Sequence, residues 1–246
     1  MEIEINHLGQ PIDFVVANWR VPDRPTRATM EGRFCRLEAL EAERHAEALH
    51  DANAVDVEGR NWTYLPYGPF DSFANYRAWI EEMSSSNDPL FFAIIDQSTN
   101  CAVGVASYLR IDPNSGSIEV GHINYSPLLQ RTPGATEAMY LMMKNAFELG
   151  YRRYEWKCNA LNAPSRIAAE RLGFSFEGIF RQAAVIKGRN RDTAWYSVID
   201  PEWPALREAF VKWLEPSNFD PKGQQFVSLK TLRSSGSKND LLFIAY

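Results

Sequence analysis

The sequence is poor in cysteine and histidine, and it has no long apolar run. Its three cysteines, Cys35, Cys101 and Cys158, are widely spaced and form no Cys-x-x-Cys pair or cluster with the four histidines. Zinc sites and disulfide frameworks need such groupings, so we expect no metal, and free thiols as in a reducing compartment. A membrane-spanning helix needs about 18 apolar residues in a row. The sequence has no such run, so no membrane partner is expected.

The charge balance is mildly acidic. The chain has 26 lysines and arginines against 31 aspartates and glutamates, a formal net charge of -5. Nucleic-acid-binding domains normally carry a basic surface, so no nucleic-acid partner is expected. The N-terminal residues Met-Glu-Ile-Glu-Ile-Asn lack the basic and apolar regions of a secretory signal, which predicts a cytoplasmic protein.

Length and hydrophobic pattern predict the fold class. The 246 residues, 45% of them hydrophobic, allow one large domain or two small ones. Short apolar or alternating runs predict strands at residues 33–40, 90–96, 102–111, 117–126, 152–158, 176–187 and 192–199. Helix formers and 3.6-residue periodicity predict helices at residues 41–52, 71–83, 133–149, 162–172 and 201–214. This order predicts one α/β domain with a mixed sheet and helices packed on it.

The two ends of the chain lack this periodicity. Residues 1–31 contain several prolines and predict an extended N-terminal strap that packs on the domain. The domain itself is expected to span residues 32–215. Residues 216–246 predict a C-terminal tail, and its apolar last six residues are a candidate interface for a homodimer.

The turn at residues 130–136, Gln-Arg-Thr-Pro-Gly-Ala-Thr, has the features of a helix N-terminus that attracts anions. Thr132 suits the N-cap and Pro133 the first helical position. The backbone N–H groups that follow have no partner in the first turn, and together with the helix dipole they favour an anion. Arg131 adds a cation beside them. An ordinary strand-to-helix turn can have the same residues, so the turn alone leaves both interpretations open.

Three short motifs carry a family resemblance. They are Arg-x-x-Gly-x-Thr at residues 131–136, Asn-x-x-Ser at residues 162–165 and Arg-Leu-Gly-Phe at residues 171–174. Their order and spacing closely resemble the GCN5-related N-acetyltransferase (GNAT) superfamily. The stretches at residues 173–178 and 181–197 are similar to the branch that contains the ribosomal-protein N-terminal acetyltransferases RimJ and RimL. The resemblance spans the predicted domain and excludes both ends of the chain.

The resemblance implies a fold, a co-substrate and a set of binding residues. The fold is a single-domain, GNAT-like α/β fold whose mixed central sheet splays into a V after the fourth strand and is flanked by helices. Acetyl-coenzyme A would enter the V as co-substrate, without a metal. Its diphosphate would lie on Arg131, Thr132, Gly134, Ala135 and Thr136, its pantetheine arm along Ile123, Asn124, Tyr125 and Ser126, and its sulfur end beside Asn162 and Ser165.

Glu119 and Ser165 are the candidate catalytic residues. An amine with a pKa of about 10 is charged at neutral pH and must lose a proton before it attacks a thioester. Glu119 lies two residues before Gly121 on the fourth strand, where many relatives carry an acid that acts through water; a surface carboxylate is the alternative. Strand alternation places His122 on the opposite face, as a second candidate base. Ser165 would hydrogen-bond the departing sulfur, or only share helix capping with Asn162.

Thr136, Pro133 and residues 127–129 depart from the usual coenzyme-binding pattern, and two further departures concern the catalytic residues. Many members have a tyrosine where this chain has Ala169, and some RimL-like enzymes have a glutamate where it has Ala184. These differences place more weight on Glu119 and Ser165 and make a ribosomal-protein acceptor less favoured. Cys158 is expected to be a buried structural thiol.

The acceptor side of the reaction has fewer signals. The aromatic residues Tyr64, Tyr67, Phe70 and Trp195 suit either an acceptor pocket or the core, and the pocket is favoured for the loop at residues 62–70, which shows no core period. The turn at residues 188–191 is expected to be solvent-exposed.

The sequence therefore predicts an acetyl-coenzyme A-dependent N-acetyltransferase. It would move an acetyl group directly to the primary amine of a small molecule or amino-acid-like acceptor. Two alternatives stay open. One is acetylation of a protein or peptide N-terminus, as in the ribosomal-protein relatives, and the other is a coenzyme A-binding module without turnover that regulates a partner.

Overall fold

The structure, a computed structural model, describes residues 3–221 and 223–236. Its strands are β1 (Glu4–Ile5), β2 (Pro11–Ile12), β3 (Met30–Glu31), β4 (Cys35–Ala39), β5 (Leu90–Asp96), β6 (Ala102–Asp112), β7 (Ser117–Tyr125), β8 (Arg153–Asn159), β9 (Ser175–Ile186) and β10 (Arg189–Ile199). Its helices are α1 (Ala42–Ala54), α2 (Phe73–Ser85), α3 (Pro133–Glu148), α4 (Ala163–Leu172), α5 (Trp203–Trp213) and α6 (Leu229–Gly236), with short 3-10 turns η1 (Arg60–Trp62) and η2 (Pro216–Asn218). None of these helices is long and apolar enough to cross a membrane.

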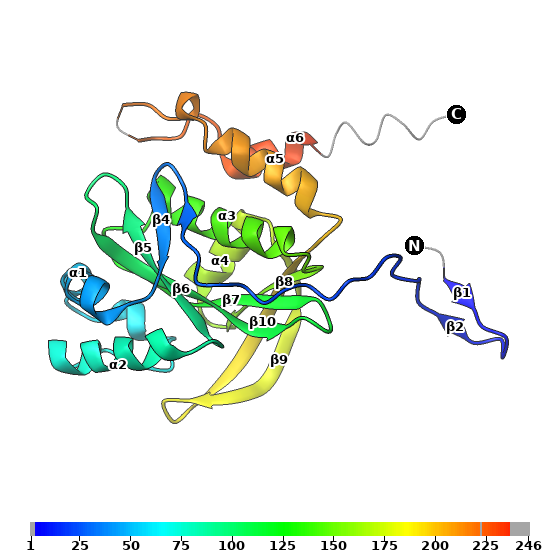
Figure 1. The fold of residues 1–246 in the computed structure, drawn as a ribbon, viewed down its shortest axis with the longest axis horizontal. Coiled ribbons are helices and arrows are strands. Elements are labelled where there is room, and N and C mark those ends of the chain that lie inside the picture. The colour runs from blue at the N-terminus through cyan, green and yellow to red at the C-terminus, as the bar shows by residue number, and fades with distance from the viewer. Residues whose placement is uncertain (1–2, 222, 237–246) are drawn as a thin grey trace.

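One large sheet carries the domain, in the strand order β3-β4-β5-β6-β7-β8-β10-β9. Neighbouring strands are antiparallel except β7 and β8, which run parallel and are joined through α3. Figure 1 shows α1 and α2 on one side of this sheet and α3 and α4 on the other, with α5 and α6 outside them. The predicted mixed α/β single domain is confirmed.

The sheet opens between β7 and β8. Their pairing covers only four residues on each strand, from Ser117 opposite Arg153 to Val120 opposite Trp156. Beyond these residues β7 continues to Tyr125 and β8 to Asn159 without pairing to each other. The splay after the fourth strand of the predicted domain is therefore confirmed, and it leaves two facing strand edges.

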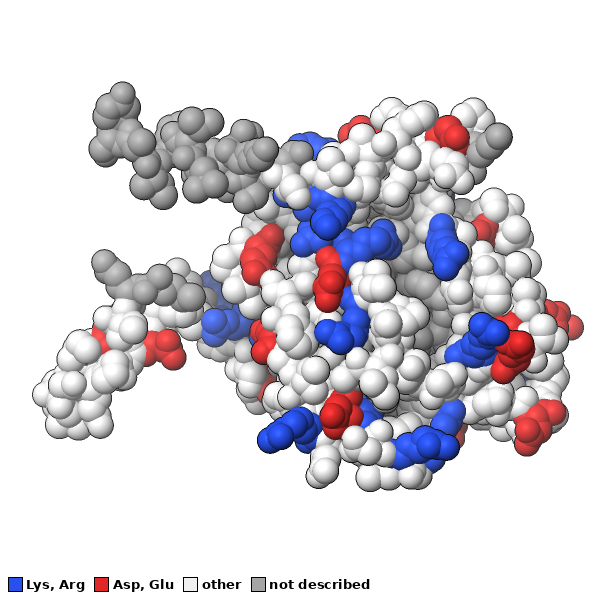
Figure 2. Space-filling view, turned by 180° about the vertical axis from the view of Figure 1, so that it is seen from behind, with Lys and Arg blue, Asp and Glu red and all other residues white. Residues whose placement is uncertain are grey.

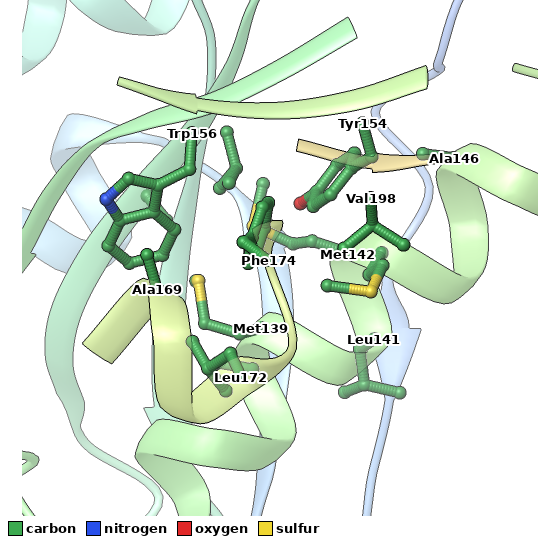
Figure 3. Close-up of a cluster of buried hydrophobic side chains, with 14 of the residues drawn as sticks. Met139, Leu141, Met142, Ala146, Tyr154, Trp156, Ala169, Leu172, Phe174 and Val198 are labelled. Atoms are coloured by element: carbon green, nitrogen blue, oxygen red, sulfur yellow. The ribbon is translucent and has the colours of Figure 1, made fainter. Parts of the chain in front are cut away.

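The core lies on both faces of the sheet. In β5, Leu90, Phe92 and Ile94 pack with the α3 side, whereas Phe91, Ala93 and Ile95 pack with α1 and α2. A strand covered on both faces reads as a continuous apolar run rather than an alternation, as the sequence of β5 does. The α3 side is the larger cluster. Figure 3 shows Met139 and Met142 of α3 facing Trp156, Phe174 and Val198.

A buried glutamate joins α3 to the start of β4. Glu137 accepts hydrogen bonds from the backbone N–H groups of Arg33 (2.9 Å), Phe34 (2.6 Å) and Cys35 (2.9 Å). Its carboxylate occupies the space beside Gly32, where a Cβ would come within 2.5 Å of it. A charged group buried at 4% exposure is stable here because three donors replace its water.

Part of the expected C-terminal tail forms helical structure that its sequence did not predict. The expected tail contains η2 and α6, which lie next to α5 in Figure 1. Asn218 organises the link, because its amide donates to the Trp213 carbonyl (3.0 Å) and accepts from Val227 N–H (2.8 Å). Arg233 of α6 donates to the Glu170 carbonyl at the end of α4 (2.7 Å). Basic side chains gather on the face below this segment, with acidic ones among them (Figure 2).

The expected N-terminal strap also contains a short hairpin that the sequence did not predict. Its strands, β1 and β2, pair only with each other and lie away from the main sheet (Figure 1). The apolar last six residues of the chain, the candidate dimer interface, lie outside the described residues.

Candidate active site

A cavity of about 240 Å³ lies where β7 and β8 separate. Glu119, His122 and Ile123 of β7 line one side of it, and Lys157 and Cys158 of β8 line the other. The walls are completed by Asn162 and Ser165 at the start of α4, by Tyr64 of the loop after η1, and by Arg191 of β10. Both candidate catalytic residues, Glu119 and Ser165, therefore line one cavity.

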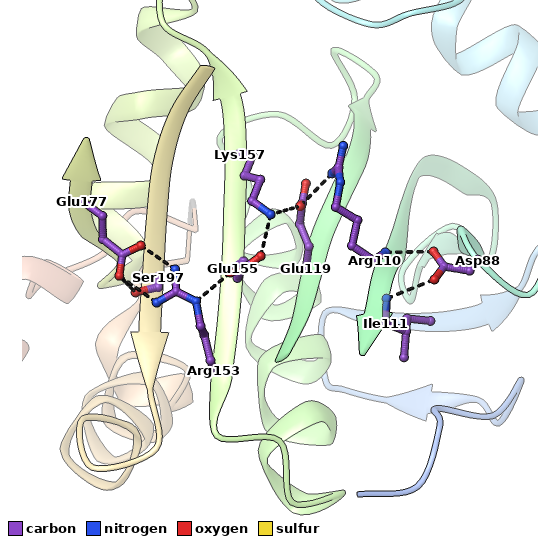
Figure 4. A network of polar contacts seen from close by, with 9 residues as sticks. All are labelled: Asp88, Arg110, Ile111, Glu119, Arg153, Glu155, Lys157, Glu177 and Ser197. Atoms are coloured by element: carbon purple, nitrogen blue, oxygen red, sulfur yellow. Dashed lines mark hydrogen bonds and ion pairs between the residues drawn. The ribbon is translucent and has the colours of Figure 1, made fainter. Parts of the chain in front are cut away.

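Glu119 is a buried carboxylate held by two cations. Its Oε2 lies 2.8 Å from the Arg110 guanidinium and 3.0 Å from Lys157 Nζ, and its side chain is only 3% exposed (Figure 4). Its Oε1 accepts no hydrogen bond within the described residues. A Cβ on Gly121 would sit 3.5 Å from Oε1, so the glycine leaves this oxygen uncovered. Burial raises the pKa of Glu119, although the two cations oppose the shift.

The polar network continues away from the cavity. Lys157 Nζ also contacts Glu155 at 2.6 Å and lies 3.7 Å from the centre of the Trp195 ring. Arg153 then links Glu155 to Glu177 (Figure 4). Because Lys157 and Arg153 each bridge two carboxylates and Arg110 holds Glu119 from β6, the orientation of Glu119 is fixed from several strands at once.

His122 does not point away from Glu119, contrary to the expectation from strand alternation. Its φ of 50° marks an irregularity in β7, and the pairing with β6 shifts register between Val105 and Ser107. A bulge of this kind re-aims a side chain, and His122 lines the same cavity as Glu119. Its Nδ1 is 3.2 Å from the Tyr67 hydroxyl, and burial lowers the pKa of His122 to about 4.

Ser165 is oriented by its neighbours. Asn162 caps α4 by accepting from Ser165 N–H (3.2 Å), as its sequence position suggested. The Trp156 indole N–H donates to Ser165 Oγ (3.0 Å). Cys158 is 6% exposed, and burial raises the pKa of its thiol despite the nearby Ser165 hydroxyl. A thiol with a raised pKa is a weak nucleophile, which agrees with a structural role for Cys158.

The aromatic loop contributes less to the cavity than expected. Trp62 is 5% exposed, and Tyr67 and Phe70 pack with it against α2. Of the four aromatic candidates only Tyr64 lines the cavity among the described residues, while Trp195 stacks on Phe180. The loop lacks a helical or strand period because it packs around Trp62. Its aromatic residues other than Tyr64 therefore pack with the core in spite of their irregular spacing.

A second hollow, of about 200 Å³, lies at the N-terminus of α3. Arg131, Thr132 and Thr136 line it, together with Arg171 of α4. Thr132 is the N-cap, accepting from Ala135 N–H (3.2 Å), and Pro133 is the first helical residue, as predicted. Gly134 and Ala135 are buried in this first turn, and a Cβ on Gly134 would face Leu129 and Cys35 in the interior.

Sequence reasoning did not single out Arg171 as a binding residue. Its guanidinium donates to Thr136 Oγ1 (2.8 Å), and burial lowers the pKa of Arg171. Among the described residues that line the hollow there are two arginines and no carboxylate. The sequence signal that could have identified Arg171 is its position in the motif Arg-Leu-Gly-Phe. The donor set suits an anion such as a diphosphate.

The edge of β7 between the two hollows has polar atoms of its own. Asn124 and Ser126 are buried, and Asn124 Oδ1 and Ser126 Oγ have no hydrogen-bond partner within the described residues. The Tyr125 carbonyl accepts from Asn61 (3.1 Å) and Gln130 (2.8 Å), and its hydroxyl donates to the Ala135 carbonyl. The Tyr125 carbonyl is thus already satisfied, whereas Ile123 is the expected pantetheine residue that lines the cavity.

Comparisons with known proteins bear on the family and the fold of the chain. A family model described as an acetyltransferase (GNAT) domain matches residues 35–175. The crystal structure of a GCN5-related N-acetyltransferase from Brucella melitensis is 49% identical, with a TM-score of 0.87, covering 89% of this chain and 100% of that chain. The uncharacterized N-acetyltransferase p20 from Bacillus licheniformis is 26% identical over 180 residues, which cover 68% of this chain and 99% of the relative. The ribosomal L7/L12 alpha-N-protein acetyltransferase RimL shares the fold at 22% identity and a TM-score of 0.60, covering 70% of this chain and 94% of RimL.

Proposed function

The chain belongs to the GNAT family and is an N-acetyltransferase, and we propose that it transfers an acetyl group from acetyl-coenzyme A to the primary amine of a small, amino-acid-like acceptor. The observation that carries this proposal is the meeting of Glu119 and Ser165 in one cavity at the opening of the sheet. The volume of about 240 Å³ suits a small acceptor.

The anion hollow supports the coenzyme assignment. When bound, acetyl-coenzyme A supplies an acetyl group activated as a thioester. Arg131 and Arg171 would hold its diphosphate beside the first turn of α3, because the hollow has two arginines at a helix N-terminus. The unpaired edge of β7, with Ile123 facing the cavity, would hold the pantetheine arm between the two hollows.

Glu119 would act as the general base. Its Oε2 is anchored by Arg110 and Lys157, which leaves Oε1 to accept a proton from the amine, directly or through a water. The amine nitrogen then forms the new C–N bond while the C–S bond breaks. Burial supports this role because a raised pKa makes a carboxylate a stronger base.

Ser165 would assist the departing sulfur. Its oxygen accepts from the Trp156 indole, so the hydroxyl hydrogen, which also lies near the Cys158 thiol, can donate to a thiolate in the cavity. This donor takes the place of the tyrosine that many family members carry where this chain has Ala169, a residue that is fully buried here.

Thiol release from acetyl-coenzyme A, measured with a panel of amines, amino acids and short peptides, tests the proposal. Release with small amines or amino acids is expected. Release only with peptides would indicate a protein N-terminus as the acceptor, an alternative suggested by the likeness of sequence motifs and fold to RimL. Strong thermal stabilisation by acetyl-coenzyme A without release for any acceptor would indicate a module without turnover.

A further inference from the structure

Arg191 lines the cavity and lies beside an irregularity in the pairing of β9 with β10. The expected exposed turn at residues 188–191 is shorter than predicted, because β9 ends at Ile186 and β10 already begins at Arg189. Arg191 pairs with Ala184, but Thr193 pairs with Phe180, so two residues on β10 span four on β9. Asp192 holds this bulge by accepting from Gln182 N–H (2.7 Å). Bulges beside active sites commonly re-aim a side chain.

Within the part of the chain that the structure describes, the Arg191 guanidinium has no carboxylate partner. Its Nε is buried and has no hydrogen bond within the described residues. Glu119 attracts the Arg191 charge electrostatically but makes no ion pair with it, because Oε2 of Glu119 already contacts Arg110 and Lys157. Burial lowers the pKa of Arg191, yet an arginine keeps its charge in proteins. A partly buried, unpaired charge is unfavourable, so this site favours an anion.

Another partly buried arginine of the same sheet shows the contrast. Arg153 has two carboxylate partners, Glu155 and Glu177. Arg191 differs in facing a cavity rather than a neighbouring carboxylate. The missing partner of Arg191 therefore belongs in the space where the acceptor would bind.

We propose that Arg191 binds a carboxylate of the acceptor, so that the acceptor is a free amino acid or a close analogue with an amine and a carboxylate. The proposal rests on the proposed acetyltransferase function. Guanidinium and carboxylate match in two parallel hydrogen bonds, which fixes orientation as well as position. With its carboxylate on Arg191, a small acceptor in this cavity presents its amine to Glu119. The first residue of a peptide has its α-carboxyl in an amide and lacks this anchor.

Matched acceptors test the role of Arg191. Thiol release would be measured for the twenty amino acids and for the amides of those that react. Wild-type protein is expected to prefer the acids, and Arg191→Gln to raise KM for the acids by roughly 10- to 100-fold while changing the amides little. Arg191→Lys keeps the charge but not the paired geometry and should fall between them. The control is Arg189→Gln, an exposed arginine on the same strand.

A binding measurement separates this inference from the proposed function. Calorimetry without coenzyme would measure the binding of N-acetyl-amino acids and of their amides to wild-type protein and to Arg191→Gln. The compounds would be those derived from the amino acids that react best or, if none reacts, from all twenty amino acids. Tighter binding of the acids that Arg191→Gln abolishes supports the inference even if turnover fails. The inference would be overturned if wild-type protein turned over or bound the acids and the amides equally, or if it bound neither class. It would also be overturned if Arg191→Gln weakened the binding of both classes equally. Absence of thiol release with every acceptor would count against the acetyltransferase proposal alone.

Discussion

The Trp156 indole N–H donates a hydrogen bond to the Ser165 hydroxyl over 3.0 Å, which ties the core of β8 to the first turn of α4. The bond occupies a lone pair of the oxygen and leaves its hydrogen to donate. We predict that Ser165→Ala lowers kcat by ~10²-fold, the effect of removing one donor from a developing anion. Stopped assays of thiol release check this, and stabilisation by acetyl-coenzyme A should change little. An unchanged kcat would show that the Ser165 hydroxyl serves only as a hydrogen-bond acceptor for Trp156.

Glu119→Gln should lower kcat/KM by roughly 10²- to 10⁴-fold, because the amide cannot accept the amine proton. Glu177→Gln is the matched control, since Glu177 belongs to the same network but does not line the cavity (Figure 4). Full activity in Glu119→Gln would remove this residue from the mechanism.

The pH dependence of the wild-type reaction follows from the burial of Glu119. The base must be deprotonated, and its raised pKa means that activity rises with pH through a value above the ordinary one for glutamate. This rise of activity at the acidic side of the pH–rate profile should disappear in Glu119→Gln. His122 has a pKa of about 4. If the rise lies near pH 4, persists in Glu119→Gln and is lost in His122→Asn, the base is His122.

Arg171→Gln should weaken coenzyme binding by roughly tenfold or more, because it removes a charge-assisted hydrogen-bond donor from the anion hollow. The expected observation is a smaller thermal stabilisation by coenzyme A at a fixed concentration. Arg207→Gln, an exposed arginine on α5, serves as the control. Equal stabilisation of both variants would place the diphosphate elsewhere.

Glu137→Ala should reduce the free energy of unfolding by about 3 kcal/mol or more, since it leaves three backbone N–H groups of the β4 entrance without a partner. Glu148→Ala on the same helix removes only an exposed pair with Lys144 at 3.7 Å and should change stability by less than about 0.5 kcal/mol. Urea unfolding of both variants measures the difference, and equal midpoints would show that other groups satisfy these amides.

Much of the fold was predictable because it follows from local patterns. The apolar run of β5 and the Thr132 cap with Pro133 specify their own structures, and both are found as expected. Neither irregular pairing was predictable from the sequence. At His122 one added residue breaks the alternation of β7, and opposite Arg191 and Thr193 the strand β9 has two extra residues. The helix α6 has eight residues and depends on contacts with α4 and α5 that no local pattern contains.

The site was predictable to the extent that its motifs are contiguous. Glu119 and Ser165 lie in one cavity as expected from the resemblance. Arg171 and Arg191 were missed as binding residues because an arginine on a helix or near a turn usually faces solvent. Only the tertiary arrangement shows that one faces the anion hollow and the other the cavity.

The short pairing between β7 and β8 also bears on solubility. Unpaired strand edges ordinarily invite strands from other chains and promote aggregation. Here the two open edges begin in the middle of the sheet, after Val120 and Trp156, and face each other across a small cavity with a charged wall. The unpaired edges of β7 and β8 therefore lie inside the sheet and are not available for pairing with a strand of another molecule, as an outer edge strand would be.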